Sequence, residues 1–177
     1  MKIGIDIDET IVNTHEIALE YGKKYAPELN PKTYEDVNKF SAREFLEKYI
    51  YEIQANVSLK RGVREALDSF KKNGYELIFI TARGNSLVYD YEDATKKVFD
   101  KYDLPFDKII YKCYPKGKAA KEENLNYFID DKEAVLDDVT KYGIKAIRIV
   151  NDLTEESKYP KFDDWNEVFK YIVGEEK

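Results

Sequence analysis

Five short apolar runs recur along the chain, and each predicts a buried strand. They cover residues 2–7, 75–80, 108–111, 126–129 and 145–150. Nearly continuous apolar strands are typical of a parallel sheet whose two faces are both covered, because a strand with one face in solvent alternates with polar residues. The pattern therefore predicts a sheet buried between two layers of helices.

Between these runs, apolar residues recur every three or four positions, which is the spacing of an amphipathic helix. The four stripes of this kind cover residues 63–70, 88–102, 135–142 and 165–172, and the first ends before Gly74. Strands that alternate with helices form right-handed β–α–β units. The predicted fold class is thus α/β, with a doubly wound, Rossmann-like, mainly parallel sheet.

One stretch interrupts the alternation, between the first strand and a helix that begins near Arg61. Residues 14–25 have a helical pattern, and residues 27–40 are interpreted as irregular. A further helical stripe follows at Leu46, Tyr49, Ile50 and Ile53. We interpret residues 14–58 as a small helical cap inserted over the C-terminal edge of the sheet.

The chain length suits this division, since 177 residues are enough for one α/β domain with a modest insertion. On this interpretation residues 1–13 and 59–177 form the core domain. The single cysteine, Cys113, excludes an intrachain disulfide, and we interpret it as a small buried residue rather than a nucleophile.

The charge and hydropathy of the chain indicate whether it binds nucleic acid or membranes. The net charge of −6, from 29 Lys and Arg against 35 Asp and Glu, argues against nonspecific binding of nucleic acid. No apolar run approaches the roughly 20 residues that span a membrane, and the N-terminus lacks the apolar segment of a signal peptide. We expect a cytoplasmic protein that binds neither nucleic acid nor membranes; the oligomeric state stays open.

Polar side chains follow the ends of four predicted strands, where open α/β sheets bind their ligands. In strand order they are Asp6, Asp8 and Thr10; Thr81, Ala82 and Arg83; Lys116 and Lys118; and Asp130 and Asp131. Clustered carboxylates raise one another's pKa unless a cation joins them. A site built from oxygen atoms favours a hard divalent cation, and the expected cofactor is therefore Mg2+.

This constellation resembles the haloacid dehalogenase superfamily of phosphohydrolases, whose four motifs occur here in the family order over residues 1–13 and 59–150. The resemblance implies that Asp6 is a nucleophile that becomes phosphorylated. It implies that Asp8 protonates the leaving oxygen and then activates the hydrolytic water. An aspartate at position 8 also favours a phosphatase over the dehalogenases and ATPases of the superfamily.

The remaining motifs imply partners for the phosphoryl group and the metal. Thr81 would hydrogen-bond a phosphoryl oxygen, and a lysine would neutralise charge on the nucleophile and the phosphoryl group. The carboxylates of Asp130 and Asp131 would complete the Mg2+ site with Asp6 and the backbone carbonyl of Asp8. We count four further residues as candidates for phosphate binding, namely Thr10, Ala82, Arg83 and Lys118.

Several assignments stay open. Either Lys116 or Lys118 could be the motif lysine, and we favour Lys116 because it precedes Gly117 and the expected start of a helix. Asp130 is favoured over Asp131 as the direct metal ligand, because it is the first residue beyond the strand. Arg83 could instead form a surface ion pair. His15 is expected to be exposed or to cap a helix, with a substrate contact as the alternative.

The segments FITAR and FIDDK, the short chain and the cap position look like those of the 5'(3')-deoxyribonucleotidases and their bacterial nucleotidase relatives. This resemblance implies removal of phosphate from nucleoside monophosphates. One alternative is a phosphatase for another small ester, such as a sugar or cofactor phosphate. Another is a non-enzymatic phosphoacceptor domain of the response-regulator type. That class places its acidic pair after strand one and its phosphorylated aspartate after strand three, an order that differs from the order here.

Overall fold

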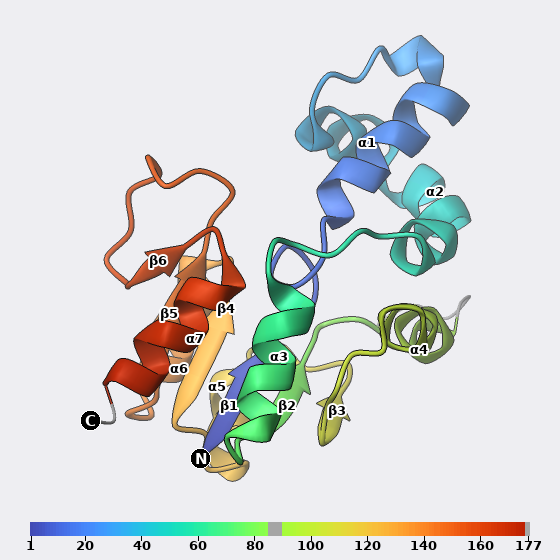
Figure 1. The fold of residues 1–177 in the computed structure, drawn as a ribbon. Helices are drawn as coiled ribbons and strands as arrows, with labels where there is room; N and C mark the ends of the chain where they lie inside the picture. Colours follow the sequence, from blue (N-terminus) through green and yellow to red (C-terminus); the bar gives the residue numbers. More distant parts are fainter. Residues whose placement is uncertain (85–89, 176–177) are drawn as a thin grey trace.

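Parallel strands form the centre of the computed structural model (Figure 1), which describes residues 1–84 and 90–175, with the side chains of 29 and 38–47 left aside. Within these residues the sheet has six strands in the order β3-β2-β1-β4-β5-β6. The strands are β1 Lys2–Ile5, β2 Glu76–Ile80, β3 Lys108–Ile110, β4 Tyr127–Asp130, β5 Lys145–Ile149 and β6 Lys161–Phe162. Each neighbouring pair is parallel. The predicted doubly wound, Rossmann-like sheet is confirmed.

Five of these strands coincide with the predicted apolar runs, and β6 was missed. Its two residues are only half-buried, so they leave no apolar run in the sequence. The strand order reverses between β1 and β4, the place where open α/β sheets bind their ligands. The backbone N–H of Asp6 donates to the carbonyl of Ile129 at 3.0 Å, which continues the β1–β4 pairing to the end of both strands.

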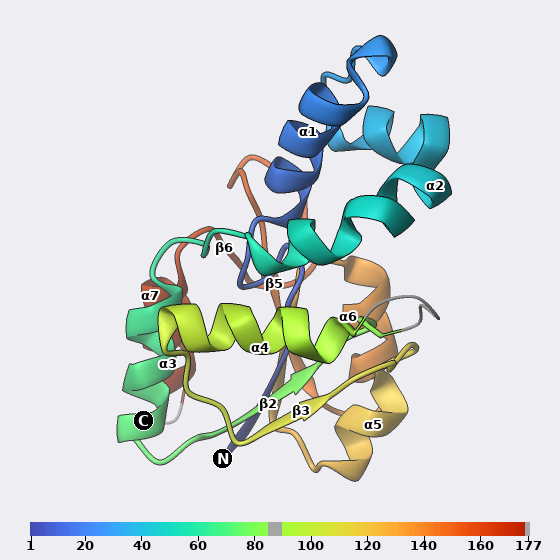
Figure 2. The same ribbon diagram turned by 90° about the vertical axis from the view of Figure 1, so that its right-hand side faces the viewer.

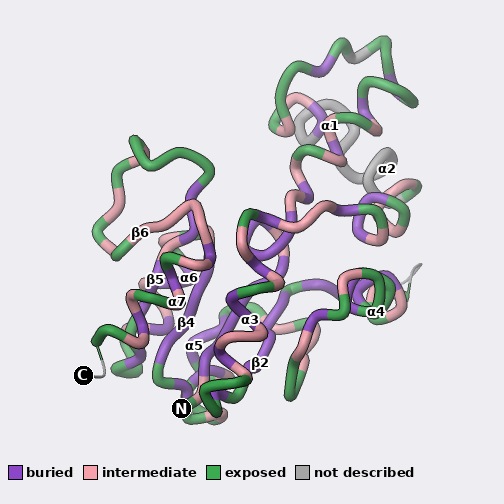
Figure 3. Tube along the Cα trace, in the orientation of Figure 1, coloured by how far each residue is buried: buried purple, intermediate pink, exposed green. Residues whose placement is uncertain are grey.

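Helices cover both faces of the sheet (Figure 2). On one side lie α3 Val63–Lys72, α4 Tyr91–Tyr102 and α7 Trp165–Gly174, packed on Ile3, Ile5 and Phe79. On the other side lie α5 Gly117–Glu122 and α6 Glu133–Thr140, packed on Ile78, Ile80 and Phe128. Figure 3 shows the resulting run of buried positions along the central strands. Helices occupy all four predicted stripes, but Tyr142 lies beyond the end of α6 and is exposed, which corrects the end of the third stripe; Val88 lies outside the described residues.

The inserted segment between β1 and α3 contains α1 Thr14–Tyr25, the 3-10 helix η1 Pro27–Leu29 and α2 Tyr34–Ala55. These helices lie beyond the C-terminal end of β1 (Figure 1), around the small apolar cluster Ala18, Ala26, Val37 and Ile53. The helix predicted over residues 14–25 is confirmed. Ile53 of the later stripe is buried in that cluster, and the side chain of Leu46 lies outside the described part. The boundaries 14–58 of the cap stay our interpretation.

The prediction that residues 27–40 are irregular was wrong, because α2 already begins at Tyr34. A capping box starts it: the Thr33 hydroxyl accepts the backbone N–H of Asp36 at 3.3 Å, and the Asp36 carboxylate accepts the backbone N–H of Thr33 at 2.9 Å. This pairing satisfies amide groups that have no partner within the first turn. The capping residues Thr33 and Asp36 are visible in the sequence, but they follow a proline-containing stretch that suggested a loop.

Two linkers join the inserted helices to the sheet, and they run side by side. Val12 of the entering linker pairs antiparallel with Leu59 of the leaving linker. The backbone N–H of Lys60 donates to the carbonyl of Ile11 at 2.9 Å, and that of Asn13 donates to the carbonyl of Ser58 at 3.0 Å. These bonds fix where the cap leaves and rejoins the core. Within the described residues, every helix is too short or too polar to cross a membrane.

Trp165 ties α7 to the loop after β1, and its loss is expected to destabilise the fold. The indole is 0% exposed, and its Nε1–H donates to the backbone carbonyl of Thr10 at 2.9 Å. In Trp165→Phe that carbonyl loses its donor and a void opens, which is expected to cost about 2–4 kcal/mol. Urea unfolding of both proteins measures the difference. A change below about 0.5 kcal/mol, the range of neutral surface substitutions, would contradict this assignment.

Candidate active site

Three carboxylates meet at the switch point of the sheet. Asp6 follows β1, Asp130 ends β4 and Asp131 follows it, and each offers an oxygen atom within 4.8 Å of the others. Asp6 and Asp130 are 7% and 0% exposed. Burial, together with the charge of Asp130, raises the pKa of Asp6 to about 7 although the Lys116 ammonium opposes it. Burial and the charges of Asp130 and Asp6 raise the pKa of Asp131 to about 8.

Lys116 supplies the positive charge inside this cluster. It precedes the first residue of α5, and its Nζ lies 2.5 Å from Asp6 Oδ1 and 2.8 Å from Asp130 Oδ2. Burial alone would lower the pKa of Lys116, but the two carboxylates outweigh it and raise that pKa. Lys118 lies on the solvent side of α5, with 82% of its side chain exposed beside Glu122. Lys118 thus lies apart from the carboxylate cluster, and its contact with phosphate stays a prediction.

Asp8 lies two residues after Asp6 but has different partners. Its carboxylate accepts two bonds from Arg83, from Nε at 2.8 Å and Nη2 at 2.7 Å, and one from the Thr14 hydroxyl at 2.6 Å. Burial would raise the pKa of Asp8, but the Arg83 guanidinium and these hydrogen bonds lower it to about 2. The side chain of Asp8 is not part of the carboxylate cluster found among the described residues.

Arg83 is buried rather than on the surface, at 4% exposure. Besides Asp8 it binds Thr95 of α4, whose hydroxyl accepts from Nη1 at 3.2 Å. A surface ion pair, one reading of the sequence, is thus wrong. The guanidinium contacts the Asp8 carboxylate, and a contact of Arg83 with phosphate stays a prediction.

The remaining predicted residues lie close to the strand ends. Thr10 is fully buried, and its hydroxyl accepts the backbone N–H of Asp131 at 3.1 Å. It therefore joins the loops after β1 and β4, and its role as a phosphate contact stays a prediction. Thr81 follows β2 and is 1% exposed; its hydroxyl accepts the backbone N–H of Arg83 at 3.1 Å. Ala82 is exposed beside it.

Sequence reasoning missed three residues around Asp8. Thr14 was treated only as the start of a helix, although its position directly after the first motif could have suggested a contact. Glu9 and Lys60 are both buried, and Glu9 Oε2 lies 3.7 Å from Lys60 Nζ. Lys60 comes after the whole cap in the sequence, so no local pattern connects it with Glu9.

The carboxylate cluster suits a hard divalent cation. The Oδ1 atom of Asp131 is buried and has no hydrogen-bond partner among residues 1–84 and 90–175. Both oxygens of Asp130, by contrast, accept bonds: Oδ2 from Lys116 at 2.8 Å and Oδ1 from the backbone N–H of Lys132 at 2.9 Å. A buried acceptor without a donor is costly, and oxygen ligands of this kind are those that Mg2+ prefers.

Aromatic side chains lie on the cap above the site. The rings of His15, in the first turn of α1, and Tyr34, at the start of α2, stack at 3.7 Å with an interplanar angle of 11°. The His15 side chain is 40% exposed, and burial lowers its pKa although Glu9 opposes the shift. Tyr25 instead stacks on Tyr49, with ring centroids 4.7 Å apart.

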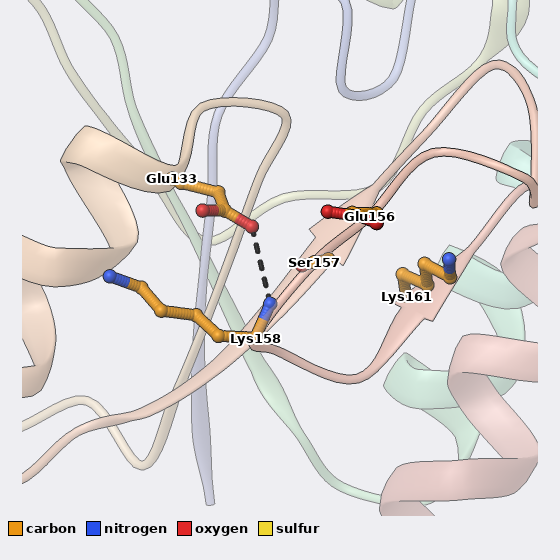
Figure 4. Close-up of a pocket in the computed structure, with 5 residues that line it drawn as sticks. All are labelled: Glu133, Glu156, Ser157, Lys158 and Lys161. Carbon is orange, nitrogen blue, oxygen red and sulfur yellow. Dashed lines mark hydrogen bonds between the residues drawn. The ribbon is translucent and has the colours of Figure 1, made fainter.

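Two hollows lie near the C-terminal ends of the strands. A small one of about 80 Å³ brings cap and core residues together beside the cluster, namely Glu9, His15, Asp131, Arg148, Asn151 and Glu155. A wider one of about 580 Å³ lies between the start of α6 and β6, with Glu133, Glu156, Ser157, Lys158 and Lys161 around it (Figure 4). There the backbone N–H of Lys158 donates to Glu133 at 3.3 Å. The wider hollow contains none of the candidate site residues.

Comparison with known proteins places this fold. No protein-family model matches the chain. It is 25% identical over 185 residues to a nucleotidase from Clostridium acetobutylicum, an alignment that covers 97% of this chain and 93% of the relative. A haloacid dehalogenase-type phosphatase from Thermococcus onnurineus has a TM-score of 0.69 at 16% identity, over 98% of this chain and 99% of that one.

An L-2-haloacid dehalogenase also matches, with a TM-score of 0.66 at 14% identity, over 97% of this chain and 98% of that one. The chain therefore has the fold of the haloacid dehalogenase superfamily hydrolases, and the resemblance seen in the sequence is confirmed at the level of the fold. Phosphatases and dehalogenases share this fold, so the choice between their reactions depends on the side chains of the site.

The raised pKa values of Asp6 and Asp131 predict how stability depends on pH and Mg2+. Without metal, the native protein keeps protons on these groups that the unfolded chain has lost above about pH 4. The free energy of unfolding should therefore fall as the pH rises from about 4 to about 8. Mg2+ needs the ionised carboxylates and the native site, so it should raise the melting temperature more at pH 8 than at pH 5.

Thermal unfolding with EDTA or with excess Mg2+ measures this effect. At one hundred times its dissociation constant, a ligand stabilises by about 2.7 kcal/mol, or roughly 5–10 °C for a domain of this size. Asp131→Asn should reduce both the pH dependence and the response to Mg2+. An equal rise at pH 5 and pH 8 would count against these carboxylates as the metal ligands.

Proposed function

We propose that this protein is a Mg2+-dependent phosphomonoester hydrolase that forms an aspartyl-phosphate on Asp6 and acts on nucleoside monophosphates. The observation that carries the proposal is that two neighbouring aspartates have different partners. Asp6 lies against Lys116 in a carboxylate cluster, whereas Asp8 lies between Arg83 and Thr14. One carboxylate is thus placed for attack and the other for proton transfer.

In the first step an oxygen of Asp6 attacks the phosphorus atom. The bond between phosphorus and the leaving oxygen breaks, and Asp8 donates its proton to that oxygen. A phosphate dianion beside Asp8 raises the pKa of its carboxyl, which favours the protonated form that this step needs. Lys116 lowers the repulsion between the Asp6 carboxylate and the incoming phosphate.

In the second step water attacks the phosphorus of the aspartyl-phosphate. Asp8, now ionised, accepts the proton of that water, the bond between Asp6 and phosphorus breaks, and inorganic phosphate leaves. Arg83 and Thr14 keep Asp8 ionised and oriented, which is the form required of a base. The Thr81 hydroxyl and the backbone N–H of Ala82 are the proposed donors to the phosphoryl oxygens.

Asp6 and Asp131 would bind Mg2+ directly, together with the backbone carbonyl of Asp8. We prefer Asp131 to Asp130 as the direct ligand because both Asp130 oxygens already accept hydrogen bonds. Asp130 then orients Lys116, which we take as the motif lysine. Bound Mg2+ would supply the charge neutralisation that phosphoryl transfer demands.

Two observations support a nucleotide as the substrate. The curated relative from Clostridium acetobutylicum is a nucleotidase, and the stacked His15–Tyr34 pair offers an aromatic surface near the site. A base stacked here would extend from a phosphate bound at Asp6.

Replacing the nucleophile tests the reaction. Asp6→Asn keeps the shape of the side chain but removes the attacking carboxylate, so kcat should fall on the order of 10³-fold or more. The measurement is Mg2+-dependent hydrolysis of p-nitrophenyl phosphate, which EDTA should abolish and added Mg2+ restore. Asp152→Asn, on the exposed loop after β5, is the matched control. Full activity of Asp6→Asn would show that another group attacks the phosphorus.

Replacing Tyr34 tests the substrate. Stacking on an aromatic side chain is worth about 1–3 kcal/mol per base, so Tyr34→Leu should lower kcat/KM for nucleoside 5'-monophosphates roughly ten- to hundredfold. Ribose 5-phosphate has the same phosphate and pentose without the base, and its kcat/KM should stay within about twofold. Tyr25→Leu, in the other stacked pair, is the control. Sugar phosphates that outperform every nucleotide by about a hundredfold, or some 2.7 kcal/mol, would contradict the nucleotide assignment.

A further inference from the structure

Glu9 occupies a backbone conformation that most residues avoid. Its φ is +56°, in the left-handed region where a side chain crowds the backbone and glycine is the usual residue. The residue is nevertheless 6% exposed, so its carboxylate is buried as well as its backbone strained. A buried carboxylate at a strained position indicates that the side chain makes contacts which compensate for both.

The contacts of Glu9 reach both linkers of the cap. Oε1 accepts the backbone N–H of His15, in the first turn of α1, at 2.7 Å, and Oε2 lies 3.8 Å from the Nδ1 of the same histidine. On the other side Oε2 lies 3.7 Å from Lys60 Nζ, with both side chains 7% exposed. Glu9 therefore joins the segment that enters the cap to the segment that leaves it.

Lys60 extends this contact to the loop after β5. Its ammonium donates to the Asn151 side chain in that loop, and Asn151 lines the same small hollow as Glu9 and His15. A chain of contacts thus runs from α1 through Glu9 and Lys60 to the core. Glu9 lies in the same loop as Asp8, so the residue that contacts both linkers is also part of the catalytic loop.

His15 connects Glu9 to the aromatic surface of the cap. Its backbone is bound by Glu9, and its ring stacks on Tyr34. We propose that Glu9 is a positioning residue that sets the cap, and with it the His15–Tyr34 pair, at a defined place over the carboxylate cluster. This inference rests on the proposed function, because the substrate contacts of the cap matter only if the cluster binds a phosphate ester.

Two variants separate positioning from folding. Glu9→Gly relieves the backbone strain but also removes the contacts to His15 and Lys60, so its two effects on the melting temperature oppose each other and the fold should be retained. Glu9→Gln keeps an acceptor for the His15 amide but loses the charge that faces Lys60, and should give an intermediate result. Glu16→Gln changes an exposed glutamate in the first turn of α1 and is the matched control.

Kinetics with two substrates give the first readout. A nucleoside 5'-monophosphate reaches the cap, whereas acetyl phosphate has a leaving group too small to do so. Because a misplacement of about 1 Å can cost on the order of a hundredfold, Glu9→Gly should raise KM for the nucleotide roughly ten- to hundredfold. Its kinetics with acetyl phosphate should stay within about twofold of wild type. Equal losses on both substrates would overturn the proposal.

Amide hydrogen exchange gives a second readout that needs no catalysis. In Glu9→Gly the amides of α1 should exchange faster, while those of β1 and β4 keep their protection. Unchanged exchange in α1 would overturn the positioning role. If the wild type hydrolyses neither substrate, the proposed function fails, and the exchange experiment still decides whether Glu9 fixes the cap.

Discussion

The site depends on the mutual repulsion of buried carboxylates and on the Lys116 ammonium among them. β1 and β4 are parallel neighbours, so Asp6 and Asp130 lie at adjacent strand ends. Asp131 follows Asp130 in the sequence and is the third carboxylate of the cluster. Lys116 contacts two of the three. Negative charge is left over, and it makes the strand ends a place where a cation is stabilised and protons bind tightly. Burial and this imbalance together raise the pKa values of Asp6 and Asp131.

Asp6 and Asp8 show how a short turn can assign different chemistry to similar residues. The chain leaves the sheet after β1, and the backbone N–H of Ile11 returns to the carbonyl of Ile7 at 3.0 Å. Asp6 stays beside β4, while Asp8 is turned toward Arg83. Pairing with a buried guanidinium lowers the pKa of Asp8, whereas burial and the neighbouring carboxylates raise the pKa of Asp6. Two aspartates at spacing two thereby acquire opposite proton affinities.

Much of this arrangement could be predicted from sequence, because it follows from periodicity. Apolar runs located five strands, and the ends of these runs and the loops after them contain Asp6, Lys116 and Asp130. Contacts between distant segments could not be predicted in this way. That Arg83 faces Asp8 depends on how β2 lies beside β1, and that Thr10 supports Asp131 depends on the gap between two loops. The short strand β6 has too few residues to produce a pattern.

The paired linkers at Val12 and Leu59 have a consequence for how this chain could change over time. The cap leaves and rejoins the core at neighbouring points. It can therefore be removed or replaced without rearranging the sheet. Insertions within the cap leave the spacing of the strand ends unaltered. If the proposed function holds, selectivity for the leaving group can therefore change through the inserted segment while the residues at the strand ends stay the same.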